Sequence, residues 1–98
     1  MDIKISSVHF DADKKLIDFI TKKVKKLVKF YEEIISAEVT LRLENSQEMD
    51  NKVAEIKLYI RGNDLFAKKQ SKSFEESTDN AIEALRQQIS KHKGKLRD

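Results

Sequence analysis

Apolar residues recur in this sequence with two different spacings, and the order of these spacings restricts what the chain can fold into. Over residues 13–31 they recur every three or four positions, which predicts an amphipathic helix. Either Asp11 or Asp13 can accept hydrogen bonds from the first free amides of this helix. Its predicted buried stripe consists of Leu16, Phe19, Ile20, Val24, Leu27 and Tyr31.

A second helix is predicted near the end of the sequence, because Ser73 and Glu76 have the spacing of a capping box. We expect this helix to fray near Gly94, since glycine weakens a helix interior. Its predicted inner stripe consists of Phe74, Thr78, Ala81, Ile82, Leu85 and Ile89.

Three further segments alternate between apolar and polar residues, as strands with one buried face do. They cover about residues 2–8, 38–44 and 54–61, and a fourth strand is expected over residues 65–71. The polar residues 45–51 predict a loop, and Gly62-Asn63-Asp64 predicts a turn. Strands with one polar face favour an antiparallel sheet that is covered on one side only.

The predicted order of elements is therefore β-α-β-β-β-α. The simplest packing of such elements is an α+β two-layer sandwich, in which two helices cover one face of a four-stranded sheet. The chain has 98 residues and no proline, and it contains neither an internal repeat nor a low-complexity linker. We therefore expect residues 1–98 to form a single domain.

Composition argues against several classes of site. The chain has no cysteine, which removes disulfides, thiolate zinc sites and cysteine nucleophiles. His9 and His92 lack metal-ligand spacing, and Gly62 and Gly94 are isolated instead of forming a phosphate-binding loop. We therefore expect no cofactor, no metal, no small-molecule substrate and no enzymatic activity. No apolar run approaches the roughly 20 residues that span a bilayer, and the N-terminus does not have the layout of a signal peptide. A cytoplasmic protein without a membrane partner is expected.

The formal net charge of +3 conceals charges that are sorted into blocks. Residues 14–29 contain seven lysines and one acid, whereas residues 32–55 contain seven acids and two bases. A solvated helix face usually mixes the two signs, so crowded lysines predict a bound polyanion that neutralises them. Lys23 is predicted on the flank of the apolar stripe, where a charge would contribute nothing to folding, and it begins a row with Lys26 and Lys29. The side opposite the stripe is predicted to carry Lys15, Lys22, Lys25, Lys26 and Lys29.

The end of the second predicted helix is basic as well. Acids at the start of a helix and bases at its end complement the helix dipole, and this explanation stays open beside RNA binding. If both helices lie on one face of the sheet, their basic sides can border a common groove that fits an RNA backbone. The bases of this segment are Arg86, Lys91, His92, Lys93, Lys95 and Arg97.

The aromatic residues fall mostly on the predicted inner stripes, so we expect them in the core. No strand is predicted to carry an exposed aromatic pair of the kind on which RNA bases stack in some sheet proteins. This favours recognition of phosphate and shape over reading of single-stranded bases.

The two basic segments resemble those of the ribosome hibernation promoting factors. Residues 16–27, LIDFITKKVKKL, are similar to the first helix of that family, which has bases at the positions of Lys23 and Lys26 and often at Lys29. Residues 85–96, LRQQISKHKGKL, are similar to the end of its second helix.

The order of elements and the position of Ala67 also agree with that family. The family usually has an arginine where this chain has Gln87, often a base where it has Ala84, and an acid-x-tyrosine opening where it has Ser73-Phe74-Glu75. The chain resembles the short form of the family, which does not have the added C-terminal dimerisation domain.

The resemblance implies a protein that lies between the head and body of the small ribosomal subunit. There it would occupy the path of mRNA and tRNA and block translation in stress or stationary phase. The implied partners are the ribosomal RNA of the small subunit and the intact ribosome. Charge and resemblance together predict that the RNA-binding residues are Lys22, Lys23, Lys25, Lys26, Lys29, Arg86, Lys91, Lys93 and Lys95.

Two alternatives stay open. The order of elements is similar to that of double-stranded-RNA-binding domains, which is compatible with a free duplex-binding module. The acidic block of residues 32–55 is compatible with a protein-interaction module, whose binding should survive high salt better than phosphate binding would.

Overall fold

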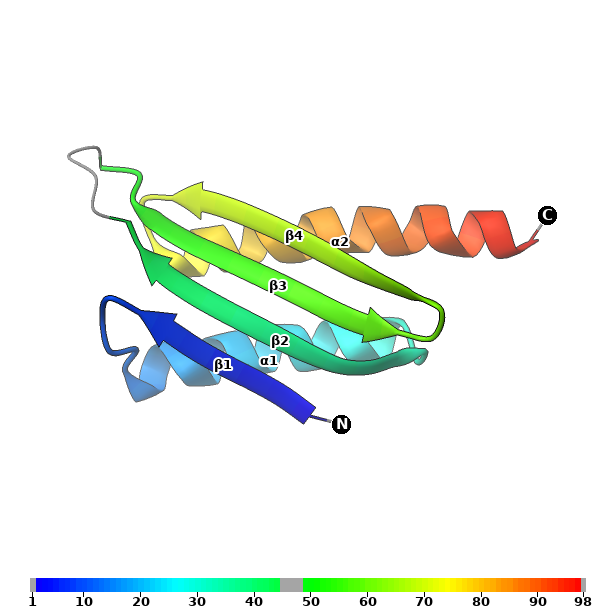
Figure 1. The fold of residues 1–98 in the computed structure, drawn as a ribbon, viewed down its shortest axis with the longest axis horizontal. Helices are drawn as coiled ribbons and strands as arrows, with labels where there is room; N and C mark the ends of the chain where they lie inside the picture. Colours follow the sequence, from blue (N-terminus) through cyan, green and yellow to red (C-terminus); the bar gives the residue numbers. More distant parts are fainter. Residues whose placement is uncertain (1, 45–48, 98) are drawn as a thin grey trace.

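The structure, a computed structural model, describes residues 2–44 and 49–97, with side chains as far as Lys91. The elements follow the predicted order, and the predicted class of fold is confirmed: one four-stranded sheet carries two helices (Figure 1). The elements are β1 (Asp2–Val8), α1 (Lys14–Phe30), β2 (Ile34–Leu43), β3 (Lys52–Ile60), β4 (Asn63–Ser71) and α2 (Phe74–Arg97).

The strands lie in the order β1-β2-β3-β4. The strand β3 is antiparallel to both β2 and β4, but β1 and β2 are parallel, so the prediction of an antiparallel sheet is wrong for the pair β1 and β2. The reason is α1, which returns the chain along the sheet so that β2 runs in the direction of β1, with Asp2 beside Ser36. A helical crossover of this kind joins parallel strands.

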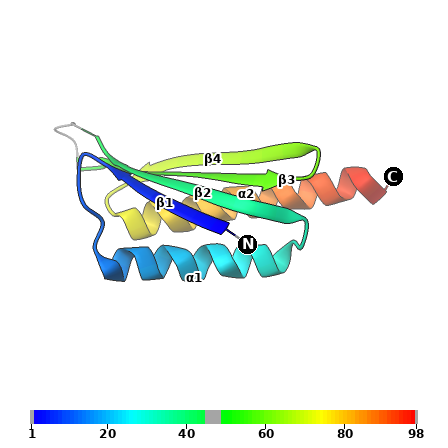
Figure 2. The ribbon, with the colours of Figure 1, turned by 60° about the horizontal axis from the view of Figure 1, so that its bottom comes forward.

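Both helices cover the same face of the sheet, and the opposite face of the sheet is open (Figure 2). In Figure 1, α1 lies behind β1 and β2, α2 lies behind β3 and β4, and the two helices run in the same direction. Their N-terminal ends therefore lie together at one end of the sheet. At the other end, α2 extends beyond the strands (Figure 1).

The core lies between the sheet and the helices, and the predicted stripes provide it. In α1, Ile20, Val24 and Leu27 are fully buried, and Leu16 and Phe19 pack against the same cluster. Burying a side chain of this size stabilises a fold by roughly 1.5–3 kcal/mol. The buried residues of α2 include the predicted Thr78, Ala81, Ile82, Leu85 and Ile89, and those of the sheet include Val39, Leu41, Ile56 and Leu58.

Both helix starts are capped by side chains. Asp13, not Asp11, caps α1, because its Oδ1 accepts a hydrogen bond from the Leu16 amide at 2.8 Å. At the start of α2, the Glu76 amide donates to Ser73 Oγ at 3.1 Å, which confirms the predicted cap. The expected fraying near Gly94 is wrong, since α2 continues to Arg97. One interior glycine costs only about 1 kcal/mol, which a long helix tolerates.

Several strand boundaries differ from the predictions, and β2, β3 and β4 each begin earlier than expected. The turn between β3 and β4 consists of Arg61 and Gly62, where Gly62 has φ +83°, while Asn63 already pairs with Ile60. The strand β2 begins four residues before the predicted segment and has an irregular register between Ile34 and Ser36. Of the predicted loop, residues 45–48 lie outside the described part, and residues 49–51 have no regular structure.

Polar contacts join α2 to the sheet. Ser77 is fully buried, and its hydroxyl donates to the Lys52 carbonyl at 2.6 Å and lies 2.7 Å from the hydroxyl of Ser71. The side-chain amide of Gln88 donates to the Phe66 carbonyl of the edge strand β4 at 2.9 Å. These bonds satisfy polar groups that the packing of α2 would otherwise leave without water.

Candidate nucleic-acid interface

The lysines of α1 do not all lie on one side of the helix. Lys22, Lys26 and Lys29 are exposed and fall within about 60° of one another around the helix axis, at 100° per residue. Lys25 is also exposed but lies about 200° from Lys23, on the flank that faces away from α2. The lysines predicted to bind RNA therefore do not form one continuous surface. The centre of the candidate surface is the row Lys22, Lys26 and Lys29.

Lys23 has a structural role that the sequence analysis missed. Its Nζ lies 3.3 Å from the carboxylate of Asp79 in α2 and 5.4 Å from the centre of the Phe19 ring. The prediction that a charge on this flank contributes nothing to folding is therefore wrong. Both side chains of the ion pair are close to half exposed, so the pair contributes at most about 1 kcal/mol to stability. The ion pair joins α1 to α2.

Arg86 lies on the flank of α2 that faces α1. The centre of its guanidinium group is 5.9 Å from the centre of the Phe30 ring, at the C-terminal end of α1. Its Nε is buried and makes no hydrogen bond to any described group. Gln87, where the resemblance led us to expect a base, is about 100° further round the helix. It lies beside Lys69 in a shallow hollow between α2 and β4, so Arg86 does not take the place of a base there.

Of the other predicted bases of α2, Lys91 is the one whose side chain the structure describes, and it does not share a groove with α1. Lys91 is exposed and lies about 140° from Arg86 around the helix, on the flank away from α1. Arg86 and Lys91 border a shallow hollow on the outer side of α2, together with Gln87 and Ser90. Lys93 and Lys95 belong to α2, but their side chains lie outside the described part of the chain. Among the described bases of α2, Arg86 alone faces α1, as the expected common groove requires. The candidate surface is thus the outer side of both helices.

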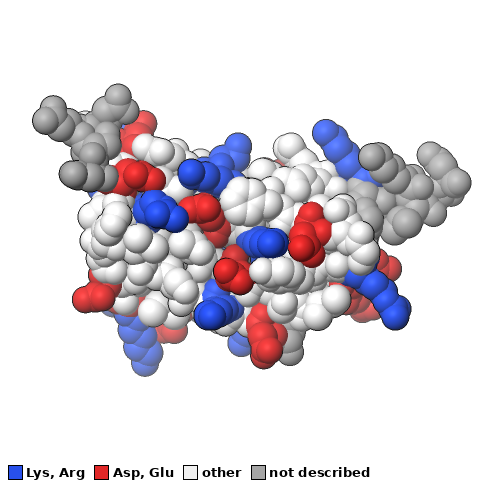
Figure 3. Space-filling model, viewed as in Figure 1, with Lys and Arg blue, Asp and Glu red and all other residues white. Residues whose placement is uncertain are grey.

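The open face of the sheet has a different character. Acids and bases alternate across it without forming a single basic area (Figure 3). Lys57 Nζ lies 3.9 Å from the carboxylate of Asp64, and the Tyr59 hydroxyl donates to Glu38 at 3.2 Å. The positive charges of this face are therefore largely balanced by neighbours of opposite sign.

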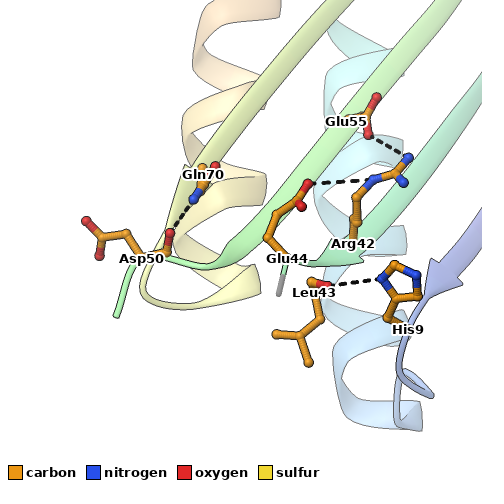
Figure 4. A network of polar contacts seen from close by, with 7 residues as sticks. All are labelled: His9, Arg42, Leu43, Glu44, Asp50, Glu55 and Gln70. Carbon is orange, nitrogen blue, oxygen red and sulfur yellow. Dashed lines mark hydrogen bonds and ion pairs between the residues drawn. The ribbon is translucent and has the colours of Figure 1, made fainter. Parts of the chain in front are cut away.

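Arg42 shows the same balance at the end of this face. Its guanidinium lies between two carboxylates, 3.4 Å from Glu55 and 4.0 Å from Glu44 (Figure 4). In the same region, His9 Nδ1 lies 3.3 Å from the Leu43 carbonyl, and Gln70 contacts the Asp50 carbonyl (Figure 4). Acids of the block 32–55 are thus engaged within the protein.

Two aromatic predictions need correction. Phe30 is 46% exposed and Phe66 is 50% exposed, so neither is a core residue. Tyr59 and Phe66 lie diagonally across β3 and β4 on the open face, which therefore carries an aromatic pair that the sequence analysis did not predict. The alternation of Leu65 and Ala67 was the available signal, since both point inward and Phe66 must then point outward. Lys57, 4.9 Å from the Tyr59 ring, and nearby acids occupy this area.

The C-terminal end of α1 is fixed by Tyr31, which is buried against the core. Its hydroxyl donates a 2.7 Å hydrogen bond to Glu33. Burial, followed by this bond and the Glu33 charge, raises the pKa of Tyr31 above its ordinary value, so the phenol stays neutral. Phe30, directly before Tyr31, is thereby held at a defined place on the surface.

Within the described ranges, no group of three His, Cys, Asp or Glu side chains could hold a metal ion. No helix among them has both the length and the apolar character needed to cross a membrane.

Comparison with known proteins agrees with the resemblance seen in the sequence. The family model for "Sigma 54 modulation protein / S30EA ribosomal protein" matches residues 3–97. Proteins named ribosome hibernation promoting factor from Klebsiella oxytoca and Escherichia coli (strain K12) are 26% and 25% identical to it. Each alignment spans 97 residues and covers 99% of this chain and 98% of the relative.

Solved structures show the same fold. A ribosomal subunit interface protein from Coxiella burnetii has a TM-score of 0.85 at 19% identity, covering 96% of this chain and 99% of that one. The N-terminal domain of Thermus thermophilus Protein Y has a TM-score of 0.79 at 20% identity, covering 94% and 99%. Because the family model spans nearly all of the sequence, this chain belongs to the Sigma 54 modulation protein / S30EA ribosomal protein family.

Proposed function

We propose that this protein is a ribosome hibernation factor, which binds the ribosome and holds it inactive. The observation that carries the proposal is the exposed row of Lys22, Lys26 and Lys29 in a member of this family. These three charges form no ion pair with any described side chain, although crowding them opposes folding. A polyanion that replaces the counterions of the row would offset this cost.

The partner is the ribosomal RNA of the small subunit, within the intact ribosome. Lysine and arginine bind RNA mainly through phosphate oxygens, which position a protein without reading bases. The residues assigned to these contacts are the predicted bases, and the row on α1 lies at their centre. Lys23 would contact RNA while it also pairs with Asp79. The full set is Lys22, Lys23, Lys25, Lys26, Lys29, Arg86, Lys91, Lys93 and Lys95.

Inhibition by this protein is steric. The chain measures 47 × 25 × 18 Å along its principal axes, so it fills a substantial volume on the path of mRNA and tRNA. No bond is made or broken, and no cofactor takes part. A protein with this role works in the cytoplasm, where ribosomes translate.

The experiment that tests the proposal is co-sedimentation with purified ribosomes, combined with cell-free translation. The protein should sediment with small subunits and with intact ribosomes at moderate salt, and it should inhibit translation when added in excess. A protein that stays in the supernatant at moderate salt contradicts the proposal.

Competition with duplex RNA distinguishes this function from a free double-stranded-RNA-binding module. Excess duplex should not displace the protein from ribosomes if it recognises the ribosome. Equal affinity for both would favour the duplex-binding module. The protein-interaction alternative has less support, because Glu38, Glu44 and Glu55 of the acidic block already bond to Tyr59 and Arg42.

A further inference from the structure

Phe30 is a large aromatic side chain placed among cations on the surface. It is 46% exposed and is the last residue of α1. Lys26 lies one turn before it on the same side of the helix, and Lys29 is its neighbour in sequence. An apolar ring at this place gains less from burial than a core residue does, so its contribution to folding is small.

Arg86 holds a guanidinium group against this ring. It comes from α2, and its central carbon lies 5.9 Å from the ring centre, which is within the range of a cation–π interaction. The buried Nε has no hydrogen-bond partner among the described groups, so the guanidinium is partly removed from water without full compensation. The protein itself thus holds the Arg86 guanidinium beside the Phe30 ring, without a ligand.

An aromatic ring beside a guanidinium plane is the surface on which unstacked RNA bases are bound. The surrounding lysines supply phosphate contacts to the same nucleotide or its neighbours. Phe66 provides a contrast, because it is equally exposed but lies on the open face, where Lys57 beside it is paired with Asp64. Of these two exposed rings, that of Phe30 lies beside Lys26 and Lys29, which form no ion pair with any described side chain.

We propose that Phe30 and Arg86 form a stacking site for one unpaired nucleobase of the RNA to which the lysine surface binds. The site rests on the proposed function, and it adds a base contact to a surface otherwise described by phosphate contacts. It predicts that the protein docks where a base is splayed out of its helix, since a base within a duplex cannot reach the ring.

The test compares Phe30→Leu with Phe30→Tyr in co-sedimentation with small ribosomal subunits over a range of salt concentrations. Leucine keeps the apolar volume but removes the ring, so affinity should fall about tenfold, the scale of one base stack. Tyrosine keeps the ring and should restore affinity to within about twofold of the parent, because stacking needs only the aromatic face. The slope of log affinity against log salt should stay the same in both variants, since no cation is removed.

Phe66→Leu is the matched control, because it makes the same change at similar exposure on the other face. It should bind like the parent. Base-specific chemical probing of the bound small-subunit RNA adds a direct readout. The parent should protect at least one base that Phe30→Leu leaves reactive, while protection of the RNA backbone persists in both.

Equal binding by the parent and a folded Phe30→Leu variant would overturn the stacking site, as would a loss of affinity that tyrosine does not restore. Circular dichroism establishes that each variant is folded. Failure of the proposed function gives a different result, since the parent itself would then not sediment with subunits at all.

Discussion

On the open face of the sheet, Arg42 and Lys57 each lie within 4.0 Å of a carboxylate, whereas Lys22, Lys26 and Lys29 on α1 have no such neighbour among the described side chains. Both surfaces are rich in charge. They differ in pairing, because cross-strand neighbours alternate in sign while one helix face repeats the same sign. We therefore expect a polyanion to bind where the bases lack partners within the protein, and not simply where bases are numerous.

The strongest test of this comparison reverses the charge of the α1 row. The triple variant Lys22→Glu, Lys26→Glu and Lys29→Glu should abolish ribosome binding and the inhibition of translation. Folding should survive, because all three side chains are exposed. Lys22 is preferable to Lys23 here, since a glutamate at position 23 would face Asp79. Co-sedimentation and circular dichroism measure the two properties.

The control for that variant makes the same number of changes on the other face. This control is the triple variant Lys4→Glu, Lys57→Glu and Lys68→Glu. The three lysines lie on the open side of β1, β3 and β4. This variant should retain most of its binding, and so should Lys14→Glu alone. If the sheet variant lost binding and the α1 variant kept it, the assignment of the two faces would have to be exchanged.

The second prediction concerns salt. If about five bases contact phosphate, log affinity against log salt should have a slope near −4, by the duplex coefficient. Affinity would then fall by about 250-fold between 50 and 200 mM salt. The measurement is a series of co-sedimentation isotherms. A slope near zero would support a protein-interaction surface and count against the unpaired lysines as the binding site.

The third prediction is smaller and concerns α2. Lys91→Ala should weaken ribosome binding about fivefold and make the salt slope less steep by about one, as loss of one phosphate contact does. Lys91 is the best single candidate in α2 because it is the exposed base of that helix whose side chain is described and it forms no ion pair with another described side chain. Lys69→Ala, beside Gln87 in the hollow between β4 and α2, is the comparison, and it should have a weaker effect.

The smallest expected effect tests pairing itself. Asp79→Asn breaks the ion pair with Lys23 and should lower the free energy of unfolding by less than about 1 kcal/mol. It should also tighten ribosome binding about twofold, because Lys23 no longer shares its charge with an acid. Asp64→Asn removes the same charge beside Lys57 on the open face and should leave binding unchanged. Tightening by both variants alike would show a general effect of net charge.

Local patterns predicted the elements but not the contacts between them. The stripe of α1, the Ser73 cap and the order of strands follow from spacing along the chain, which the structure confirms. The parallel pairing of β1 with β2 depends on where α1 returns the chain, and alternation does not report direction. The start of β4 differs from its prediction for a similar reason. Asn63 was expected in the turn, but it pairs with Ile60 across the sheet, and the residue types of a turn do not show such a partner.

RNA binding by the residues of the candidate site stays a prediction, and the structure corrects where several of their side chains lie. Sequence separates Lys23 from Asp79 by 56 positions, so their ion pair becomes visible only when α1 and α2 lie side by side. The same holds for Arg86 over Phe30. The exposed position of Phe66, in contrast, was already present in the alternation of β4 and was predictable.

The contact between Gln88 and the Phe66 carbonyl has a consequence for behaviour at high concentration. An edge strand such as β4 offers unpaired backbone groups to any other extended chain, and this is a common route to aggregation. Here a side chain of α2 occupies one acceptor in the middle of that edge, and Lys68 and Lys69 follow two and three positions later. Addition of a foreign strand would have to break this bond and bring charges together. The helix that carries the basic residues thus also hinders the addition of another strand to the β4 edge.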